Sequence, residues 1–153
     1  MTTLKDLIFH HNNDYGFDAS QVIETMALNK TPNLSIVIPY YDVGSLFQTT
    51  LAYLESALKC IQEEESDWKH EIVIVDDGSK KYTLAHDIQE SFTTLNIIVE
   101  RLFDNQGRTK ARQTGLEKAQ YPVVLFMDAD ILVSSNLIRD CLRCRLHPLL
   151  CII

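Results

Sequence analysis

The feature that most constrains the fold is an apolar run, residues 123–127, which follows Pro122 and ends in two aspartates. A short apolar segment without polar alternation is typical of a strand buried on both faces, as in a parallel sheet. Because side chains alternate along an extended chain, Asp128 and Asp130 are predicted to project to the same side. Paired carboxylates repel each other unless a cation or hydrogen-bond donors lie between them, and they suit Mg²⁺ or Mn²⁺. From this segment alone, a helix cap beside a solvated aspartate explains the pair equally well.

The composition indicates a globular protein with an acidic surface. The 153 residues are 46% apolar and 23% charged, which is enough for one domain or for part of a larger one. The net charge of -7 argues against a general binder of nucleic acid or of anionic membranes. No apolar stretch of about 20 residues is present, and the first residues lack the apolar core of a signal peptide. We therefore expect no transmembrane segment and a cytoplasmic location, with attachment to the inner face of a membrane left open.

Strand and helix patterns alternate along the chain. Strands are predicted at residues 34–38, 70–75, 96–102 and 123–127, and helices at residues 45–64, 82–92, 108–119 and 134–145. Pro39 is predicted to end the first strand, because proline has no N–H to give to a ladder. Strands that alternate with helices predict a parallel α/β sheet with right-handed crossovers.

Acidic residues follow three of the four predicted strands. Asp42 comes shortly after the first strand, Asp76 and Asp77 after the second, and Asp128 and Asp130 after the fourth. In doubly wound sheets, ligands bind beyond the carboxyl ends of the strands, where the strand order reverses. The acids are therefore predicted to gather around one ligand site, although single acidic residues are also common in solvated loops.

Four segments in this order carry a resemblance to a known family: IVIPYYD, EIVIVDDGS, NQGRTKARQTGLEKA and YPVVLFMDAD. Together they resemble the family 2 nucleotide-sugar glycosyltransferases of the GT-A fold, over residues 34–136. Each segment is weak evidence alone, but the ordered set is specific. The resemblance implies a Rossmann-like, mainly parallel sheet with flanking helices. It also implies an enzyme that transfers a sugar from a nucleoside-diphosphate donor to an acceptor hydroxyl.

The resemblance assigns the first two loops to the nucleotide. Pro39 and Tyr41 match the loop whose aromatic ring lies against the base, and a hydrophobic contact at the sheet edge is the alternative for Tyr41. Asp42 stands where the family usually has asparagine. Asp77 matches the acid that accepts the imide hydrogen of the base, which favours a UDP-sugar, and Asp76 helps to hold the same loop.

The resemblance assigns the later segments to the nucleotide, its ribose and its diphosphate. Arg112 matches a basic residue near the nucleotide, and a solvated helix face is its alternative, since Lys110 lies beside it. Asp128 is expected near the ribose, and Asp130 is expected to reach the Mn²⁺ or Mg²⁺ ion that bridges the phosphates. Such an ion would stabilise charge on the leaving phosphate. Inversion at the anomeric carbon would need a further carboxylate as the base.

The expected domain organisation has three parts. Residues 1–33 form an N-terminal helical appendage, residues 34–146 a nucleotide-sugar-binding domain, and residues 147–153 an apolar tail with nothing to pack against. In the family, the general base and the acceptor-binding half lie well after the paired aspartates, whereas no carboxylate follows Asp140 here. The sequence is therefore interpreted as the donor-binding half of a truncated glycosyltransferase, with the catalytic base and the acceptor (carbohydrate, lipid or protein) unknown.

Three other classes remain open at this point. A response-regulator receiver also places paired acids after one strand, but it requires a later strand that bears a lysine. A haloacid-dehalogenase phosphatase has a similar apolar strand and aspartate pair, but Leu132 occupies the place of its usual threonine. A non-catalytic nucleotide-binding fragment is the third alternative. The Cys141 and Cys144 pair lacks a second ligand pair at zinc spacing, so reduced and packed thiols are expected.

Overall fold

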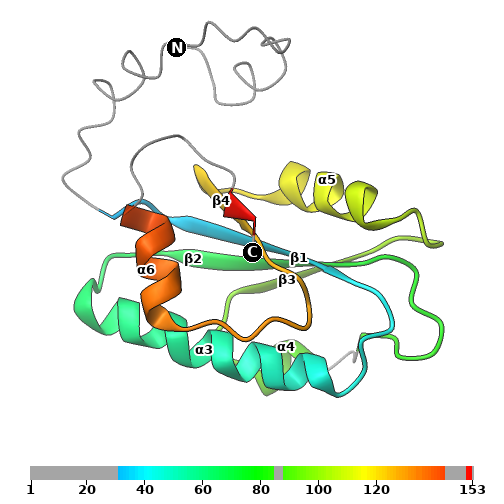
Figure 1. Cartoon of the computed structure of the whole chain (residues 1–153), viewed down its shortest axis with the longest axis horizontal. Helices are drawn as coiled ribbons and strands as arrows, with labels where there is room; N and C mark the ends of the chain where they lie inside the picture. The colour runs from blue at the N-terminus through cyan, green and yellow to red at the C-terminus, as the bar shows by residue number, and fades with distance from the viewer. Residues whose placement is uncertain (1–30, 85–87, 144–150, 153) are drawn as a thin grey trace, which may run out of the picture.

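A computed structural model describes residues 31–84, 88–143 and 151–152 of the chain (Figure 1). Its elements follow in the order β1 (Leu34–Tyr40), α3 (Leu46–Glu64), β2 (His70–Asp76), α4 (Ile88–Ser91), β3 (Ile97–Arg101), α5 (Arg108–Lys118), β4 (Val123–Phe126), α6 (Ser135–Arg143) and β5 (Cys151–Ile152). The predicted N-terminal appendage lies outside the described residues, apart from residues 31–33. Within the described residues, no helix combines the length and the apolarity that crossing a membrane requires.

The strands form one parallel sheet in the order β3-β2-β1-β4-β5. The chain first moves outward from β1 to β2 and β3, and α5 then returns it to the other side of β1. The strand order therefore reverses between β1 and β4, where the carboxyl ends of these two strands leave a crevice. The predicted fold class is confirmed, and the crevice is the place where a ligand is expected.

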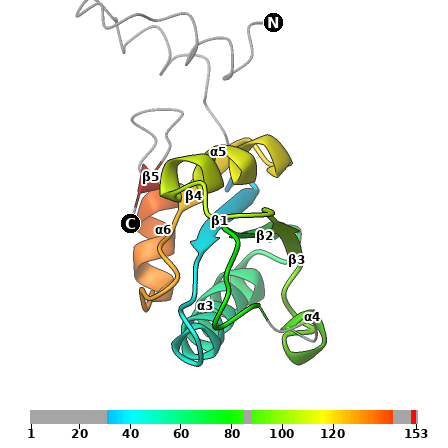
Figure 2. The ribbon, with the colours of Figure 1, turned by 90° about the vertical axis from the view of Figure 1, so that its right-hand side faces the viewer.

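Helices cover both faces of the sheet. Figures 1 and 2 show α5 on one face and α3, α4 and α6 on the other. The alternation along β1 divides its side chains between two cores, because Ile36 and Ile38 pack on the α3 side whereas Val37 packs on the α5 side. On the α5 side the helix lies very close to the sheet, since a Cβ added to Gly115 would lie 2.2 Å from Cγ1 of Val37. Helix α5 and strand β1 are thus in close contact on this face of the sheet.

Pro39 lies inside β1, so the prediction that it ends the strand was wrong. Pro39 is in register with Val75 of β2, and the strand continues to Tyr40. The carbonyl oxygen of Tyr40 points to β2 and accepts the N–H of Asp77 at 2.9 Å. Because successive residues of a strand direct their backbone polar groups to opposite sides, those of Pro39 point to β4. The β4 register ends at Val37, and the missing N–H of Pro39 therefore removes no ladder bond.

Two further expectations are corrected. The helix predicted over residues 82–92 is described only as the short α4, and residues 85–87 lie outside the description. The tail was expected to have nothing to pack against, yet Cys151 and Ile152 form β5 on the outer edge of β4. The open edge of β4 presents unpaired backbone groups that a further strand satisfies. The rest of residues 144–153 lies outside the described part.

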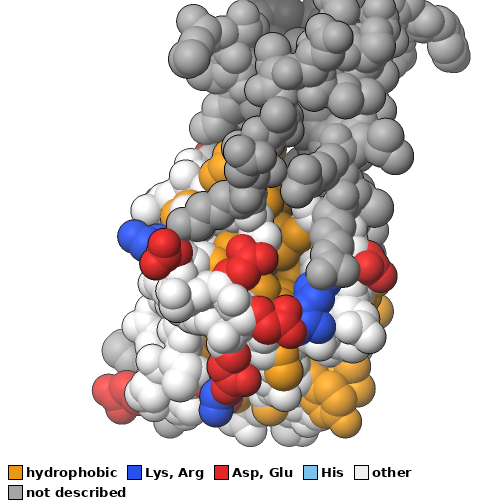
Figure 3. Space-filling view, turned by 90° about the vertical axis from the view of Figure 1, so that its left-hand side faces the viewer, with side chains coloured by type: hydrophobic (Ala, Val, Ile, Leu, Met, Phe, Trp, Pro, Cys, Tyr) orange, Lys and Arg blue, Asp and Glu red, His pale blue; other side chains and the backbone are white. Residues whose placement is uncertain are grey.

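Figure 3 views the molecule from the amino ends of the strands, where acidic side chains reach the surface beside basic and hydrophobic ones. Glu63, Glu64 and Asp67 are exposed near the connection from α3 to β2. Glu71 is buried at this end and accepts hydrogen bonds at 2.6 Å from the Ser35 hydroxyl and from a backbone N–H.

Candidate functional site

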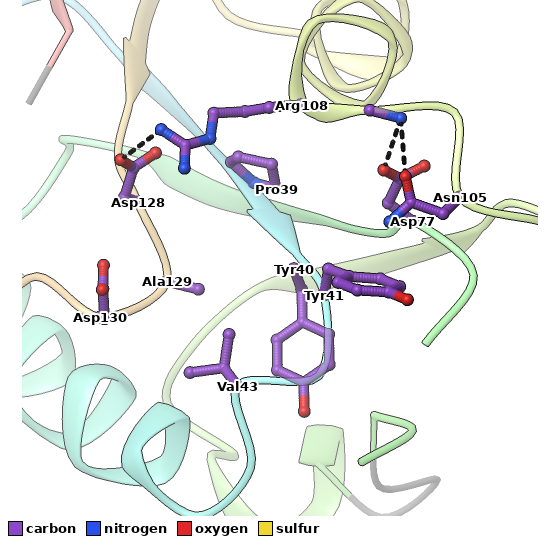
Figure 4. A pocket seen from close by; sticks show the side chains of 11 residues that line it. Pro39, Tyr40, Tyr41, Val43, Asp77, Asn105, Arg108, Asp128, Ala129 and Asp130 are labelled. Atoms are coloured by element: carbon purple, nitrogen blue, oxygen red, sulfur yellow. Dashed lines mark hydrogen bonds and ion pairs between the residues drawn. The ribbon is translucent and has the colours of Figure 1, made fainter. Parts of the chain in front are cut away.

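A cavity of about 400 Å³ lies at the carboxyl ends of β1 and β4 (Figure 4). Its size falls in the range of ordinary small-molecule sites. It is lined by Pro39, Tyr40, Tyr41, Val43, Asp77, Asn105, Gly107, Arg108, Asp128, Ala129 and Asp130. The cavity therefore occupies the crevice that the strand order predicts, and it brings together five of the predicted site residues: Pro39, Tyr41, Asp77, Asp128 and Asp130.

Asp77 forms one end of the cavity and joins two loops. Its side chain is only 3% exposed, and its two carboxylate oxygens accept the backbone N–H groups of Gln106 and Gly107, each at 2.8 Å. Gly107 has φ +90° and precedes the first residue of α5. Each carboxylate oxygen can accept a second hydrogen bond, so Asp77 keeps acceptor capacity for a ligand.

Asp76 fixes the same loop from beneath and does not line the cavity. It is buried, it pairs with Arg101 at 2.8 Å, and it accepts the backbone N–H of Ser79 at 2.9 Å. Gly78 has φ +72°, and a Cβ there would lie 2.5 Å from the carbonyl carbon of Asp104. Only glycine allows this close approach of the loops that follow β2 and β3.

Asp42 also lies outside the cavity lining and organises a loop instead. It has φ +51°, and one carboxylate oxygen accepts the backbone N–H groups of Lys80, Lys81 and Tyr82 at 3.1, 2.8 and 2.7 Å. The hydrogen bond from Tyr82 is the main cause that lowers the pKa of the Asp42 carboxyl. The position after the first strand thus connects the first loop to the loop after β2.

The two tyrosines after Pro39 have different surroundings. Tyr40 is buried, packs on Phe47 at 4.9 Å between ring centroids, and donates its hydroxyl to the carbonyl oxygen of Tyr82 at 2.7 Å. Burial raises the pKa of the Tyr40 hydroxyl. Tyr41 is 45% exposed, and its ring lies on the Asp77 side of the cavity (Figure 4). Tyr41 therefore offers a free aromatic face to a ligand.

Asp128 lies at the other end of the cavity, between two arginines. Arg112 holds one carboxylate oxygen at 2.9 Å and stacks over the ring of Phe126 at 5.9 Å, while Arg108 contacts the other oxygen at 3.3 Å. The Arg112 side chain is 24% exposed and the Arg108 side chain 67% exposed. Arg112 lies outside the cavity lining, so in this structure it acts on the cavity through Asp128.

Asp130 is exposed and, within the described residues, has no hydrogen-bond or ion-pair partner. The strand ends at Phe126, and the backbone N–H of Ile131 bonds to the Asp128 carbonyl oxygen at 3.3 Å. The two aspartates reach the same cavity, as predicted, but through this turn rather than through strand alternation.

The residues present can supply only part of the coordination shell of a divalent cation. In the described ranges, no three His, Cys, Asp or Glu side chains come together as a metal site. Mg²⁺ and similar ions are commonly held by one or two carboxylates, with substrate phosphates and water completing the shell. Asp130, assisted by Asp128, matches that incomplete donor set and would need oxygen ligands from a bound molecule.

Sequence reasoning missed several lining residues, of which Tyr40, Asn105 and Arg108 have polar side-chain groups. The Asn105 side chain accepts the backbone N–H of Gly107 at 3.2 Å. The search for acids at strand ends passed over the segment after β3, because it contributes an amide from the loop and a guanidinium from the first residue of α5. The position of this segment, directly after a predicted strand, was the signal that would have identified Asn105 and Arg108.

Comparison with known proteins identifies the family to which the chain is similar. The family model described as glycosyl transferase family 2 matches residues 35–143. The glycosyltransferase YkoT of Bacillus subtilis is 35% identical over 114 residues, which are 71% of this chain and 33% of YkoT. The family-model match covers β1 from its second residue, β2, β3 and β4, and every residue that lines the cavity.

Two solved structures have a similar fold. Staphylococcus aureus TarS (residues 1–349), in complex with UDP-GlcNAc, superposes with a TM-score of 0.58 at 27% identity, over 71% of this chain and 29% of TarS. The mannosyltransferase PcManGT of Pyrobaculum calidifontis, in complex with GDP-Man and Mn²⁺, has a TM-score of 0.59 at 20% identity, over 76% of this chain and 32% of that protein. The chain spans a third or less of the length of each of these three proteins.

Proposed function

The chain belongs to glycosyl transferase family 2, and we propose that its cavity binds the nucleoside-diphosphate part of a sugar donor, with UDP-sugars favoured. This membership removes the receiver and phosphatase alternatives. The observation that carries the proposal is the cavity itself, which places Asp77 and Tyr41 at one end and the Asp128 and Asp130 pair at the other. A nucleotide likewise has two ends, a base that can donate an N–H group and a diphosphate that binds a divalent cation.

The base is assigned to the end formed by Asp77 and Tyr41. Uracil carries an imide N–H that a carboxylate can accept, whereas the corresponding nitrogen of cytosine has no hydrogen to donate. Because Asp77 is buried and keeps acceptor capacity, pairing with an acceptor edge would leave buried groups unsatisfied. The exposed ring of Tyr41 supplies a stacking surface for the base. The TarS complex with UDP-GlcNAc supports the choice of UDP.

The diphosphate is assigned to the end formed by Asp128 and Asp130. Asp130 would hold a divalent cation, Mn²⁺ or Mg²⁺, with Asp128 beside it and phosphate oxygens completing the shell. A cation bound there would stabilise the negative charge that develops on the leaving phosphate. Arg112 would keep Asp128 in position through its 2.9 Å contact.

We assign to the whole protein the transfer of the sugar to an acceptor hydroxyl with inversion. Direct displacement at the anomeric carbon inverts its configuration and requires a base for the acceptor proton. The acids that line the cavity have other partners or roles, since Asp77 holds backbone groups, Asp128 holds arginines and Asp130 is assigned to the cation. The described residues are therefore proposed to supply donor binding, and the proposal leaves the base and the acceptor unassigned.

Calorimetric titration of the purified chain tests this proposal. UDP, CDP and GDP are each titrated with and without Mn²⁺. We expect UDP to bind, Mn²⁺ to strengthen its binding, and CDP to bind about tenfold or more weakly, which corresponds to about 1.4 kcal/mol for the mismatched base edge. A folded chain that binds none of the three nucleotides would overturn the proposal. Equal affinities for UDP and CDP would overturn the role of Asp77.

A further inference from the structure

Arg108 stands out because it is a cation in an acidic cavity. The described lining contains three carboxylates, those of Asp77, Asp128 and Asp130, and a single basic side chain, that of Arg108. A diphosphate that enters this cavity meets net negative charge. A divalent cation offsets part of that charge, and the guanidinium of Arg108 is the positive group that the chain itself provides (Figure 4).

The contact between Arg108 and Asp128 is weak and replaceable. It measures 3.3 Å, and the Arg108 side chain is 67% exposed, so water screens the pair. Arg112 holds the same carboxylate at 2.9 Å from a more buried position. When Arg108 leaves Asp128, the carboxylate therefore keeps one arginine and its orientation.

The position of Arg108 in the fold also suits an anion. Arg108 is the first residue of α5, and the first turn of this helix contains no acidic residue. The N-terminus of a helix carries partial positive charge that adds to the charge of a basic side chain. Gly107, which also lines the cavity, has open space on the side where a Cβ would project. The backbone next to Arg108 is thus open to a ligand.

We propose that Arg108 binds the donor diphosphate, exchanging its contact with Asp128 for a contact with phosphate oxygens. In the free chain, Arg108 neutralises Asp128 and keeps the acidic end of the cavity from repelling the donor. In the donor complex, its guanidinium forms charge-assisted hydrogen bonds to the diphosphate, and the released oxygen of Asp128 turns to the cation. This inference rests on the proposed function, since it assumes a nucleoside diphosphate in the cavity.

Comparing UDP with uridine isolates the diphosphate contact. Affinities for both are measured in the presence of Mn²⁺ for the wild-type chain, for Arg108→Ala and for the control Lys110→Ala, which removes the same charge from α5 outside the cavity lining. We expect Arg108→Ala to weaken UDP binding about tenfold or more and to leave uridine binding unchanged, because one charge-assisted contact is lost. Lys110→Ala should bind both ligands as the wild type does.

Two results would overturn the inference while the proposed function stands. One is a UDP affinity of Arg108→Ala within twofold of wild type, and the other is an equal loss of affinity for UDP and for uridine. Failure of the wild-type chain to bind UDP would instead overturn the proposed function, and this inference with it. A second readout is Mn²⁺ affinity without nucleotide, which should rise in Arg108→Ala because Asp128 loses one neutralising partner.

Discussion

Replacing Asp77 with alanine removes the acceptor of two backbone hydrogen bonds at the base end of the cavity. The N–H groups of Gln106 and Gly107 both lie 2.8 Å from its carboxylate oxygens, and the Asp77 side chain is 3% exposed. Hydrogen bonds to a charged group contribute about 1.5–3 kcal/mol each, and the lower value suits these partly exposed loops. We therefore expect Asp77→Ala to lower the free energy of unfolding by about 3 kcal/mol.

Thermal and urea unfolding measure this loss. A change of about 3 kcal/mol corresponds to a fall in Tm of roughly 6–12 °C for a domain of this size. The matched control is Asp104→Ala, which removes an exposed acid from the neighbouring loop and should change stability by no more than about 0.5 kcal/mol. Equal stability of Asp77→Ala and the control would refute the argument that Asp77 joins the two loops.

The isosteric variant Asp77→Asn separates the loop from the base. Its amide keeps one acceptor oxygen but turns an NH₂ group toward the second backbone N–H, so part of the stability should be lost. An amide also donates as well as accepts, and the preference for UDP over CDP should therefore shrink. Calorimetry with both nucleotides measures the ratio, and an unchanged ratio would place the base elsewhere.

Three further predictions test the scaffold. Gly115→Ala should lower the free energy of unfolding in urea by about 1–3 kcal/mol, because its Cβ would lie 2.2 Å from Cγ1 of Val37; unchanged stability would contradict the packing of α5 on β1. Burial lowers the pKa of His70, so the unfolded chain binds more protons and stability should fall as pH drops below about 6.5, by at most about 1.4 kcal/mol per pH unit. His70→Phe should reduce this dependence of stability on pH. Equal pH dependence of the two proteins, measured by urea unfolding at pH 5–7, would refute the role of His70. Arg101→Met leaves the buried Asp76 carboxylate without its guanidinium and should cost about 2 kcal/mol, and an unchanged Tm would show that the pair contributes nothing.

The sequence was sufficient for the order of elements and for the edge at which the site lies. Apolar runs such as residues 123–127 have one structural solution in a chain that alternates strands and helices, namely a sheet covered on both faces. Right-handed crossovers were expected between the parallel strands, and a ligand site was expected beyond their carboxyl ends, where the strand order reverses. Local patterns therefore predicted the fold class, and they predicted that Asp77, Asp128 and Asp130 lie together at the carboxyl ends of the strands.

Contacts between distant segments decided what the sequence could not predict. Whether Pro39 ends β1 depends on where β4 stops, because only that pairing would need its N–H. Asp42 was grouped with the other acids, yet its φ of +51° directs its carboxylate to backbone N–H groups of residues 80–82. Local patterns could likewise not predict the contact between Arg108 and Asp128, which are 20 residues apart in the chain. The nucleotide contacts of all the predicted site residues stay predictions, and Asp42, Asp76 and Arg112 lie outside the cavity lining.

The helix predicted over residues 82–92 also differs from the structure. Apolar residues at helical spacing predicted one continuous helix, but the described helix is α4, Ile88–Ser91. Asp42 accepts three successive N–H groups from residues 80–82, which holds that backbone in a turn rather than in a helix. This contact accounts for the non-helical backbone at Tyr82, the first residue of the predicted helix, whereas residues 85–87 lie outside the description.

The most direct test of the donor-site account is the binding of Mn²⁺ in the presence and absence of UDP, measured by electron paramagnetic resonance. The account predicts weak Mn²⁺ binding to the free chain, a clear increase with UDP, and loss of that increase in Asp130→Ala. The control Glu63→Ala, which removes an exposed acid from the opposite edge of the sheet, should behave as the wild type. Mn²⁺ binding that UDP leaves unchanged, or an Asp130→Ala variant that keeps the full increase, would contradict it.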